Sequence, residues 1–169
     1  MKNEFSSFDA AKILDLPMER LRQWLKLGFI KPTVPATGQG TKAVFTLDDL
    51  YGVALFKKLL DAGFTRTVAG EYVRQFLNKE KSTPERHIAD YIIFKVFIED
   101  GETKVCAIEH TKDAIDNINI STGLQRSIKP YMLSSMPKFK YMVSDAWDTL
   151  LVVNFGQIRK GIETVLSGS

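Results

Sequence analysis

Cysteine is almost missing from this chain of 169 residues, and its scarcity narrows what the protein can be. Cys106 is the single cysteine, so no internal disulfide can form, which fits a reducing cytoplasm. No apolar run reaches about 18 residues, so neither a transmembrane helix nor a membrane partner is expected. A secretory signal is not expected either, because the N-terminal segment is acidic in places and no apolar run follows MKNEFSSFDAAK.

The residue patterns that catalysis or metal binding requires are also lacking. The Gly38–Gly40 tripeptide has neither the third glycine nor the strand–helix setting of a phosphate-binding loop. The acids at 99–102 belong to a predicted turn and are expected to be solvated, and the serine pair at 134–135 has no nearby histidine. Cys106 and His110 fall on one predicted strand, about 13 Å apart at about 3.3 Å per residue, which is too far to share an ion. We therefore expect no catalytic residue, no metal and no cofactor, and the protein is not expected to be an enzyme.

Positive charge is present but unevenly distributed. Residues 1–81 hold 13 Lys and Arg against 9 Asp and Glu, whereas residues 82–169 hold 10 against 11. Between residues 17 and 42 a single acid, Glu19, accompanies five basic residues. A phosphate backbone requires such a concentration of cations, but a solvated basic face has the same composition, so charge alone leaves both interpretations open. The five basic residues are Arg20, Arg22, Lys26, Lys31 and Lys42.

Helical signals recur through the first part of the chain. The serine pair at 6–7, followed by Asp9, predicts the start of a short helix that stops near Asp15. Pro17 suits the first position of a second helix, and Gly28 suits the position just past its end. Two short helices joined by a few residues are typical of a helix-turn-helix, with the second as recognition element. In that second helix Leu21, Trp24 and Leu25 are expected to face inward, and Arg20, Arg22, Gln23 and Lys26 largely outward.

Prolines and glycines forbid a helix in the segment that comes next. Residues 33–37 and 42–45 are expected to pair as a small hairpin, the wing, around the glycines at its tip. Thr46 and Asp49 then resemble a capping box at the start of a third helix. That helix is expected to bury Leu47, Leu50, Ala54, Leu55 and Leu59 and to stop at Gly63, and a fourth helix, capped by Thr65, to run through Val68, Tyr72, Val73, Phe76 and Leu77.

Beyond a charged, proline-containing linker at 79–85, the apolar period changes from helical to alternating. Residues 111–145 are ambiguous. Residues 155–166 are expected to form a closing helix. Strands are expected at 91–98, 103–110 and 150–154, and the inward residues of the closing helix are expected to be Ile158, Ile162, Val165 and Leu166.

Together these patterns predict an α+β fold. A winged helix-turn-helix domain is expected over residues 1–81, and a small β-containing domain with a closing helix over residues 82–169. The predicted strand at 91–98 is apolar on one face and mixes Lys95 with apolar residues on the other. Core or dimer packing is the favoured explanation of the second face, ahead of an effector pocket.

The order of several short motifs carries a family resemblance. No single motif is specific, but their order and spacing together resemble the DNA-binding domain of the MerR family of bacterial regulators, over about residues 5–78. The matching residues are Ala11, Leu21-Arg22, Trp24, Gly28-Phe29-Ile30-Lys31-Pro32, Phe45, Asp49-Leu50 and Gly63-Phe64.

The resemblance implies that the second helix and the wing contact DNA. Arg22 would contact a phosphate, while Arg20 and Gln23 would face the major groove, where an arginine fork suits guanine and glutamine suits adenine. Trp24 is assigned to the core of the domain. The candidate DNA-binding residues are Arg20, Arg22, Gln23, Lys26, Lys31, Thr41 and Lys42.

The chain departs from the family pattern at a few positions. Gln23 replaces an aromatic residue, Leu25 replaces an acid, and Ala43 replaces the wing arginine, which leaves Lys42 as the nearest cation. Lysine lacks the guanidinium fork, so weaker or shifted wing contacts are expected. The family's long dimerisation helix is not expected either, since the equivalent stretch meets Pro84 and then passes into predicted strands.

These features predict a cytoplasmic, nucleoid-associated bacterial protein that binds specific double-stranded DNA sequences and regulates transcription. A homodimer through the C-terminal region is favoured, because two half-sites double the phosphate contacts. A small-molecule effector stays open, with no residue that supports it. Two alternatives also remain: an excisionase-like or architectural factor that bends DNA, and a protein-interaction adaptor that retains the fold without binding DNA. The operator and the direction of regulation do not follow from the sequence.

Overall fold

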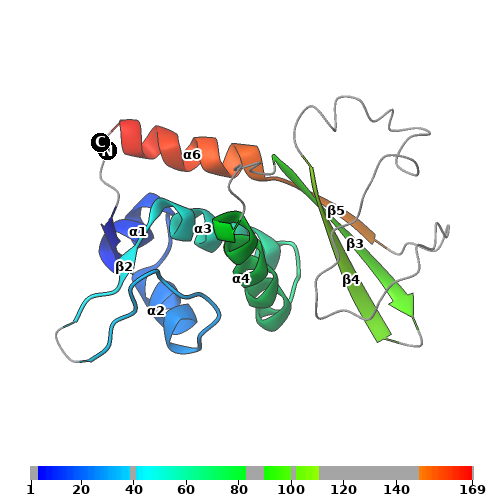
Figure 1. Cartoon of the computed structure of the whole chain (residues 1–169), viewed down its shortest axis with the longest axis horizontal. Helices are drawn as coiled ribbons and strands as arrows, with labels where there is room; N and C mark the ends of the chain where they lie inside the picture. Colours follow the sequence, from blue (N-terminus) through cyan, green and yellow to red (C-terminus); the bar gives the residue numbers. More distant parts are fainter. Residues whose placement is uncertain (1–3, 39–40, 83–89, 100–101, 111–148, 169) are drawn as a thin grey trace. The chain divides into compact units, whose positions relative to one another are not determined.

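The computed structural model describes residues 4–38, 41–82, 90–99, 102–110 and 149–168. It combines helices with two small antiparallel sheets, which confirms the predicted α+β class (Figure 1). Contacts group the chain into one unit of Met1–Arg86 with Ile158–Ser169 and a second unit of His87–Gln157. The predicted domain division after residue 81 stays a prediction. No helix among the described residues has the length and apolar character needed to cross a membrane.

The helix-turn-helix is formed by α1 (Ser7–Ile13) and α2 (Met18–Lys26). Ser6 caps α1 as predicted: its hydroxyl accepts from the Asp9 N–H at 3.2 Å, and the Asp9 carboxylate accepts from the Ser6 N–H at 3.0 Å. Pro17 lies at the N-cap of α2, one residue before its predicted position, because its ψ of 129° is still extended. Gly28 ends α2 with a φ of +73°, as expected for a residue just past a helix end.

Two longer helices, α3 (Leu47–Asp61) and α4 (Arg66–Ser82), follow in the first unit. Thr46 and Asp49 form the predicted capping box, and Gly63 follows α3 with a φ of +93°. The buried side of α3 is wider than predicted, since Tyr51, Val53 and Phe56 are buried as well. The predicted linker is wrong over residues 79–82, which continue α4, and its remaining residues lie outside the described part.

The first sheet corrects the predicted hairpin. β2 (Val44–Phe45) pairs with β1 (Phe5–Ser6), and Phe5 lies opposite Phe45 with both side chains buried. The hairpin between 33–37 and 42–45 is reduced to a single antiparallel bridge, from Val34 to Val44. Pairing with β1 buries both phenylalanines against the helical core. Pairing with the 33–37 segment stabilises β2 less, because Val34 of that segment stays 49% exposed.

The core of the first unit is built around Phe56 of α3, which is fully buried. Trp24 meets Phe56 edge to face at 4.9 Å between ring centroids, and Phe29 stacks on it at 6.3 Å. Trp24 is 3% exposed, which confirms its predicted structural role. Because Trp24 and Leu21 anchor one side of α2 in this core, the opposite side of α2 is fixed toward solvent.

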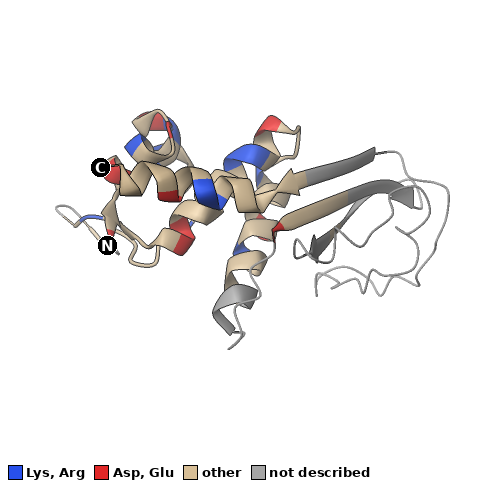
Figure 2. Cartoon of the chain, turned by 90° about the horizontal axis from the view of Figure 1, so that it is seen from above, with Lys and Arg blue, Asp and Glu red and all other residues tan. Residues whose placement is uncertain are grey.

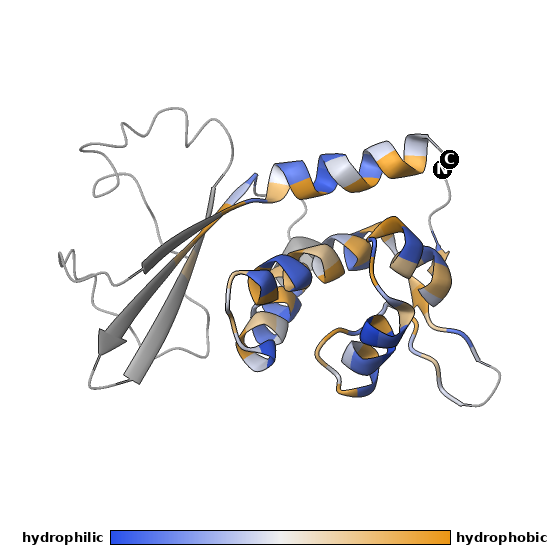
Figure 3. Cartoon of the chain, turned by 180° about the vertical axis from the view of Figure 1, so that it is seen from behind, coloured by the Kyte–Doolittle hydropathy of each residue, from blue (hydrophilic) through white to orange (hydrophobic). Residues whose placement is uncertain are grey.

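The last helix, α6 (Phe155–Ser167), has its residues from Ile158 onward in the first unit. Its apolar side faces the other helices of that unit, where Ile162 is buried (Figure 3). The Tyr51 hydroxyl of α3 donates a hydrogen bond to the Glu163 carboxylate at 2.8 Å. Burial, reinforced by this hydrogen bond, raises the pKa of Tyr51 well above its usual value. Val165 does not face inward as predicted, since its side chain is 46% exposed.

The second unit contains a three-stranded antiparallel sheet with the strand order β4-β3-β5. The predicted strands at 91–98, 103–110 and 150–154 are thereby confirmed, each with slightly different bounds: β3 is Tyr91–Glu99, β4 is Glu102–His110 and β5 is Thr149–Asn154. Ile92, Ile93 and Phe94 of β3 are all buried. The ambiguous stretch at 111–145 lies outside the described residues.

Two glycines of the first unit should respond to alanine in opposite ways. A Cβ on Gly70 of α4 would lie 2.8 Å from the carbonyl oxygen of Phe29, whereas a Cβ on Gly161 of α6 would meet nothing within 4 Å. We expect Gly70→Ala to lower the free energy of unfolding by about 1–3 kcal/mol through overpacking. Gly161→Ala should raise it by about 0.5–1 kcal/mol through helix propensity. Urea denaturation measures both, and a Gly70→Ala protein as stable as the Gly161→Ala protein would contradict the close approach of α4 to Phe29.

Candidate nucleic-acid interface

The solvent-facing side of α2 carries most of the predicted DNA-binding residues. Leu21 and Trp24 are 0% and 3% exposed, and the helical period therefore turns the residues beside them outward. This side presents three cations and an amide with bidentate hydrogen-bonding capacity. The four exposed residues are Arg20, Arg22, Gln23 and Lys26.

Arg22 is held by a neighbour on the same helix. Its Nη1 donates to the Glu19 carboxylate at 2.7 Å, and the two side chains are 64% and 83% exposed. An exposed pair of this kind contributes about 0.2–1 kcal/mol. It therefore orients the guanidinium but is too weak to prevent a contact with another anion. Arginine carries five N–H donors, and Arg22 can keep Glu19 while it donates to a phosphate.

The 31–45 segment, between α2 and α3, holds the remaining predicted residues. Lys31 and Lys42 are both exposed. Thr41 closes the loop: its hydroxyl donates to the Gly38 carbonyl at 2.7 Å and accepts from the Gly38 N–H at 2.9 Å. The structure therefore gives Thr41 a local role that the sequence did not predict, and its contact with DNA stays a prediction.

Asp49 connects this segment to α3. Its carboxylate is 4% exposed, and Oδ2 accepts from the Thr33 N–H at 2.7 Å and from the Thr46 N–H at 2.9 Å. One oxygen thus completes the cap of α3 and fixes the backbone two residues after Lys31. Sequence reasoning found the cap but missed the contact with Thr33, because nothing in the spacing marks it.

The unit places α2 and the 31–45 segment on the side opposite α6 (Figures 1 and 3). Figure 2 marks the Lys and Arg residues of the unit in blue. The structure brings Arg20, Arg22, Gln23 and Lys26 together on one helix face, and it places Lys31 and Lys42 on the exposed connection that follows that helix. Among the residues that the structure describes, no group of three or more His, Cys, Asp or Glu could hold a metal ion.

Comparison with known families agrees with this geometry. A family model described as MerR HTH family regulatory protein matches residues 5–75, from β1 into α4. Residues 5–75, less than half of the chain, are therefore similar to the helix-turn-helix domain of this family. A search of curated proteins found no match. The remainder of the chain, with the three-stranded sheet and α6, lies outside the matched stretch.

Within the matched stretch, the start of α4 adds exposed polar groups that are not among the predicted DNA-binding residues. Thr65 caps this helix, accepting from the Val68 N–H at 3.4 Å, and both Thr65 and Arg66 are exposed. The signal in the sequence is Thr65-Arg66 directly after Gly63-Phe64, of which Thr65 was expected only as the helix cap.

Proposed function

We propose that this protein is a transcriptional regulator that binds specific sequences of double-stranded DNA. The supporting observation is the exposed face of α2, which presents Arg20, Arg22, Gln23 and Lys26 from the second helix of a helix-turn-helix similar to that of the MerR family. A helix of this width fits the major groove, and these side chains can donate to phosphates and to base edges. The proposed role is binding and regulation, with no catalytic step.

Different residues of this surface serve different purposes in the proposal. Arg20 and Gln23 contact base edges and provide sequence preference, whereas Arg22 and Lys26 contact phosphates and fix the register of the helix. The 31–45 segment acts as a wing, with Lys31, Thr41 and Lys42 against the flanking backbone. Lysine is a point charge, so the wing adds affinity with little geometric selection.

The proposed regulator is a homodimer that acts in the cytoplasm of a bacterium. Residues 82–169 provide the contact between protomers, so that two copies of α2 reach two half-sites on the same DNA face. A dimer roughly doubles the number of neutralised phosphates. Such a dimer is tested by the molecular mass in solution and by the symmetry of the selected DNA sites.

Selection of bound sequences from a random DNA pool, followed by titration over a range of salt concentrations, tests the proposed function. With about four or five phosphates neutralised per protomer, the slope of log K against log salt should be about −4 per protomer. A slope near zero would contradict the electrostatic interface. Binding and bending without sequence preference would favour an architectural or excisionase-like factor. An absence of DNA binding at low salt would favour an interaction adaptor.

A further inference from the structure

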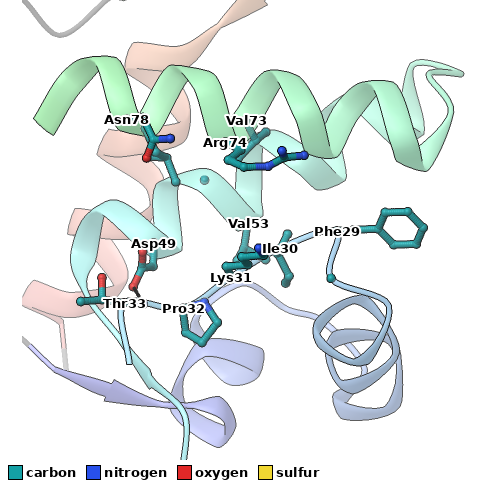
Figure 4. Close-up of a pocket in the computed structure, with 13 residues that line it drawn as sticks. Phe29, Ile30, Lys31, Pro32, Thr33, Asp49, Val53, Val73, Arg74 and Asn78 are labelled. Carbon is teal, nitrogen blue, oxygen red and sulfur yellow. Dashed lines mark hydrogen bonds between the residues drawn. The ribbon is translucent and has the colours of Figure 1, made fainter. Parts of the chain in front are cut away.

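A groove of about 370 Å³ lies in the first unit, and most of its lining has no role in the proposed DNA contact (Figure 4). One wall is the backbone that leaves α2, and the others are α3 and α4. The volume falls in the range of about 300–1,000 Å³ that is typical of small-molecule sites. A ligand seated there would touch residues 28–33, which lead from α2 into the 31–45 segment.

The lining of the groove combines an apolar surface with positive charge. Ile30, Val53, Val73 and Leu77 contribute apolar side chains from three elements. Arg74 of α4 and Lys31 of the connecting backbone belong to different walls, and both are exposed (Figure 4).

The groove is lined by one acid, Asp49, which does not neutralise the charge of these two cations. Asp49 also lines the groove, but its Oδ2 already accepts from the Thr33 and Thr46 N–H groups. The lining of the groove therefore includes two cations and one acid, and the carboxylate of that acid is engaged with the backbone. An anionic group on a compact apolar body matches this surface better than a cation or a sugar does.

We propose that this groove binds a small organic monoanion, a carboxylate on a compact apolar body, and that this binding lowers the affinity of the protein for DNA. The coupling rests on the proposed function, because Lys31 belongs both to the groove and to the proposed DNA surface. A carboxylate that engages Lys31 withdraws one cation from the DNA phosphates. Since coupling between two ligands is reciprocal, DNA weakens the binding of the anion by the same factor.

Titration of the full chain with 2-naphthoate, without DNA, tests the site directly. Backbone amide signals of residues 28–33 should shift saturably, and the neutral alcohol 2-naphthalenemethanol should bind at least about tenfold more weakly because it lacks the charge-assisted hydrogen bonds. Arg74→Gln should reduce naphthoate affinity several-fold, toward that of the alcohol, because Lys31 is then the remaining cation of the groove. Lys58→Gln removes an exposed cation of α3 outside the groove and should change nothing. Equal binding of both probes, no saturable shift, or an unaffected Arg74→Gln protein would overturn the site.

The same variants separate this proposal from the proposed function. A naphthoate concentration that saturates the wild-type chain should weaken its DNA binding several-fold. At the same concentration Arg74→Gln should show a smaller effect, while without naphthoate it binds DNA as tightly as Lys58→Gln does. Naphthoate binding by a chain that does not bind DNA would support the groove and overturn the proposed function. DNA binding that naphthoate does not change, in a chain that binds naphthoate, would overturn the coupling.

Discussion

Replacing both Arg20 and Arg22 with alanine is expected to abolish specific DNA binding. A base contact by arginine contributes about 1–3 kcal/mol, and a hydrogen bond to a charged group contributes about 1.5–3 kcal/mol. Losing one of each weakens binding about 100-fold per protomer or more, at about 1.4 kcal/mol for each factor of ten. Fluorescence anisotropy titration on a selected DNA site measures the loss, and the salt slope should fall by about one per protomer, because Arg22 is the phosphate contact of the pair.

The double variant should keep its fold, which makes the result interpretable. Both side chains are exposed, the Arg22–Glu19 pair contributes at most about 1 kcal/mol, and alanine is the better helix former. Lys58→Ala with Lys160→Ala is the matched control, because it removes the same charge from exposed positions on α3 and α6. If the control loses as much DNA affinity as the α2 variant, the loss reflects net charge and α2 is not the recognition helix.

The ends of the helices could be predicted because they depend on residues close together in the sequence. Each capping box joins residues three apart, such as Thr46 and Asp49, and each stop at Gly28 or Gly63 depends on the φ of one residue. The exposed face of α2 was predictable for a similar reason, since burying Leu21 and Trp24 decides which side faces solvent. Local chemistry therefore accounts for most of the candidate site.

Features that depend on distant residues could not be predicted in the same way. The sequence between the glycines predicts a hairpin, but β2 pairs with β1, about forty residues earlier in the chain. The contact of Thr33 with Asp49 and the contact of Tyr51 with Glu163 leave no periodic trace in the sequence. Composition also misleads at 79–82, where lysine and glutamate are typical of a linker and yet are good helix formers.

Replacing Asp49 with alanine is expected to destabilise the domain and to weaken DNA binding. The buried carboxylate holds two backbone N–H groups, one in the cap of α3 and one at Thr33. Loss of the cap costs about 1 kcal/mol, and loss of a hydrogen bond to a charged group costs about 1.5–3 kcal/mol. The free energy of unfolding should therefore fall by about 2–4 kcal/mol in urea denaturation. DNA affinity, measured where the variant is still folded, should fall several-fold, because Lys31 and the 31–45 segment lose their anchor.

Asp9→Ala provides the control for this prediction, because Asp9 occupies the same position in the capping box of α1. It accepts from the Ser6 N–H at 3.0 Å, as Asp49 accepts from the Thr46 N–H. Its removal should cost about 1 kcal/mol, and the excess cost of Asp49→Ala then measures the bond to Thr33. Asp49→Asn retains an acceptor oxygen without the charge, so its cost in unfolding free energy should lie between those of Asp9→Ala and Asp49→Ala. Equal costs for the two alanine variants would mean that the bond to Thr33 does not hold the segment, and the wing would then need another anchor.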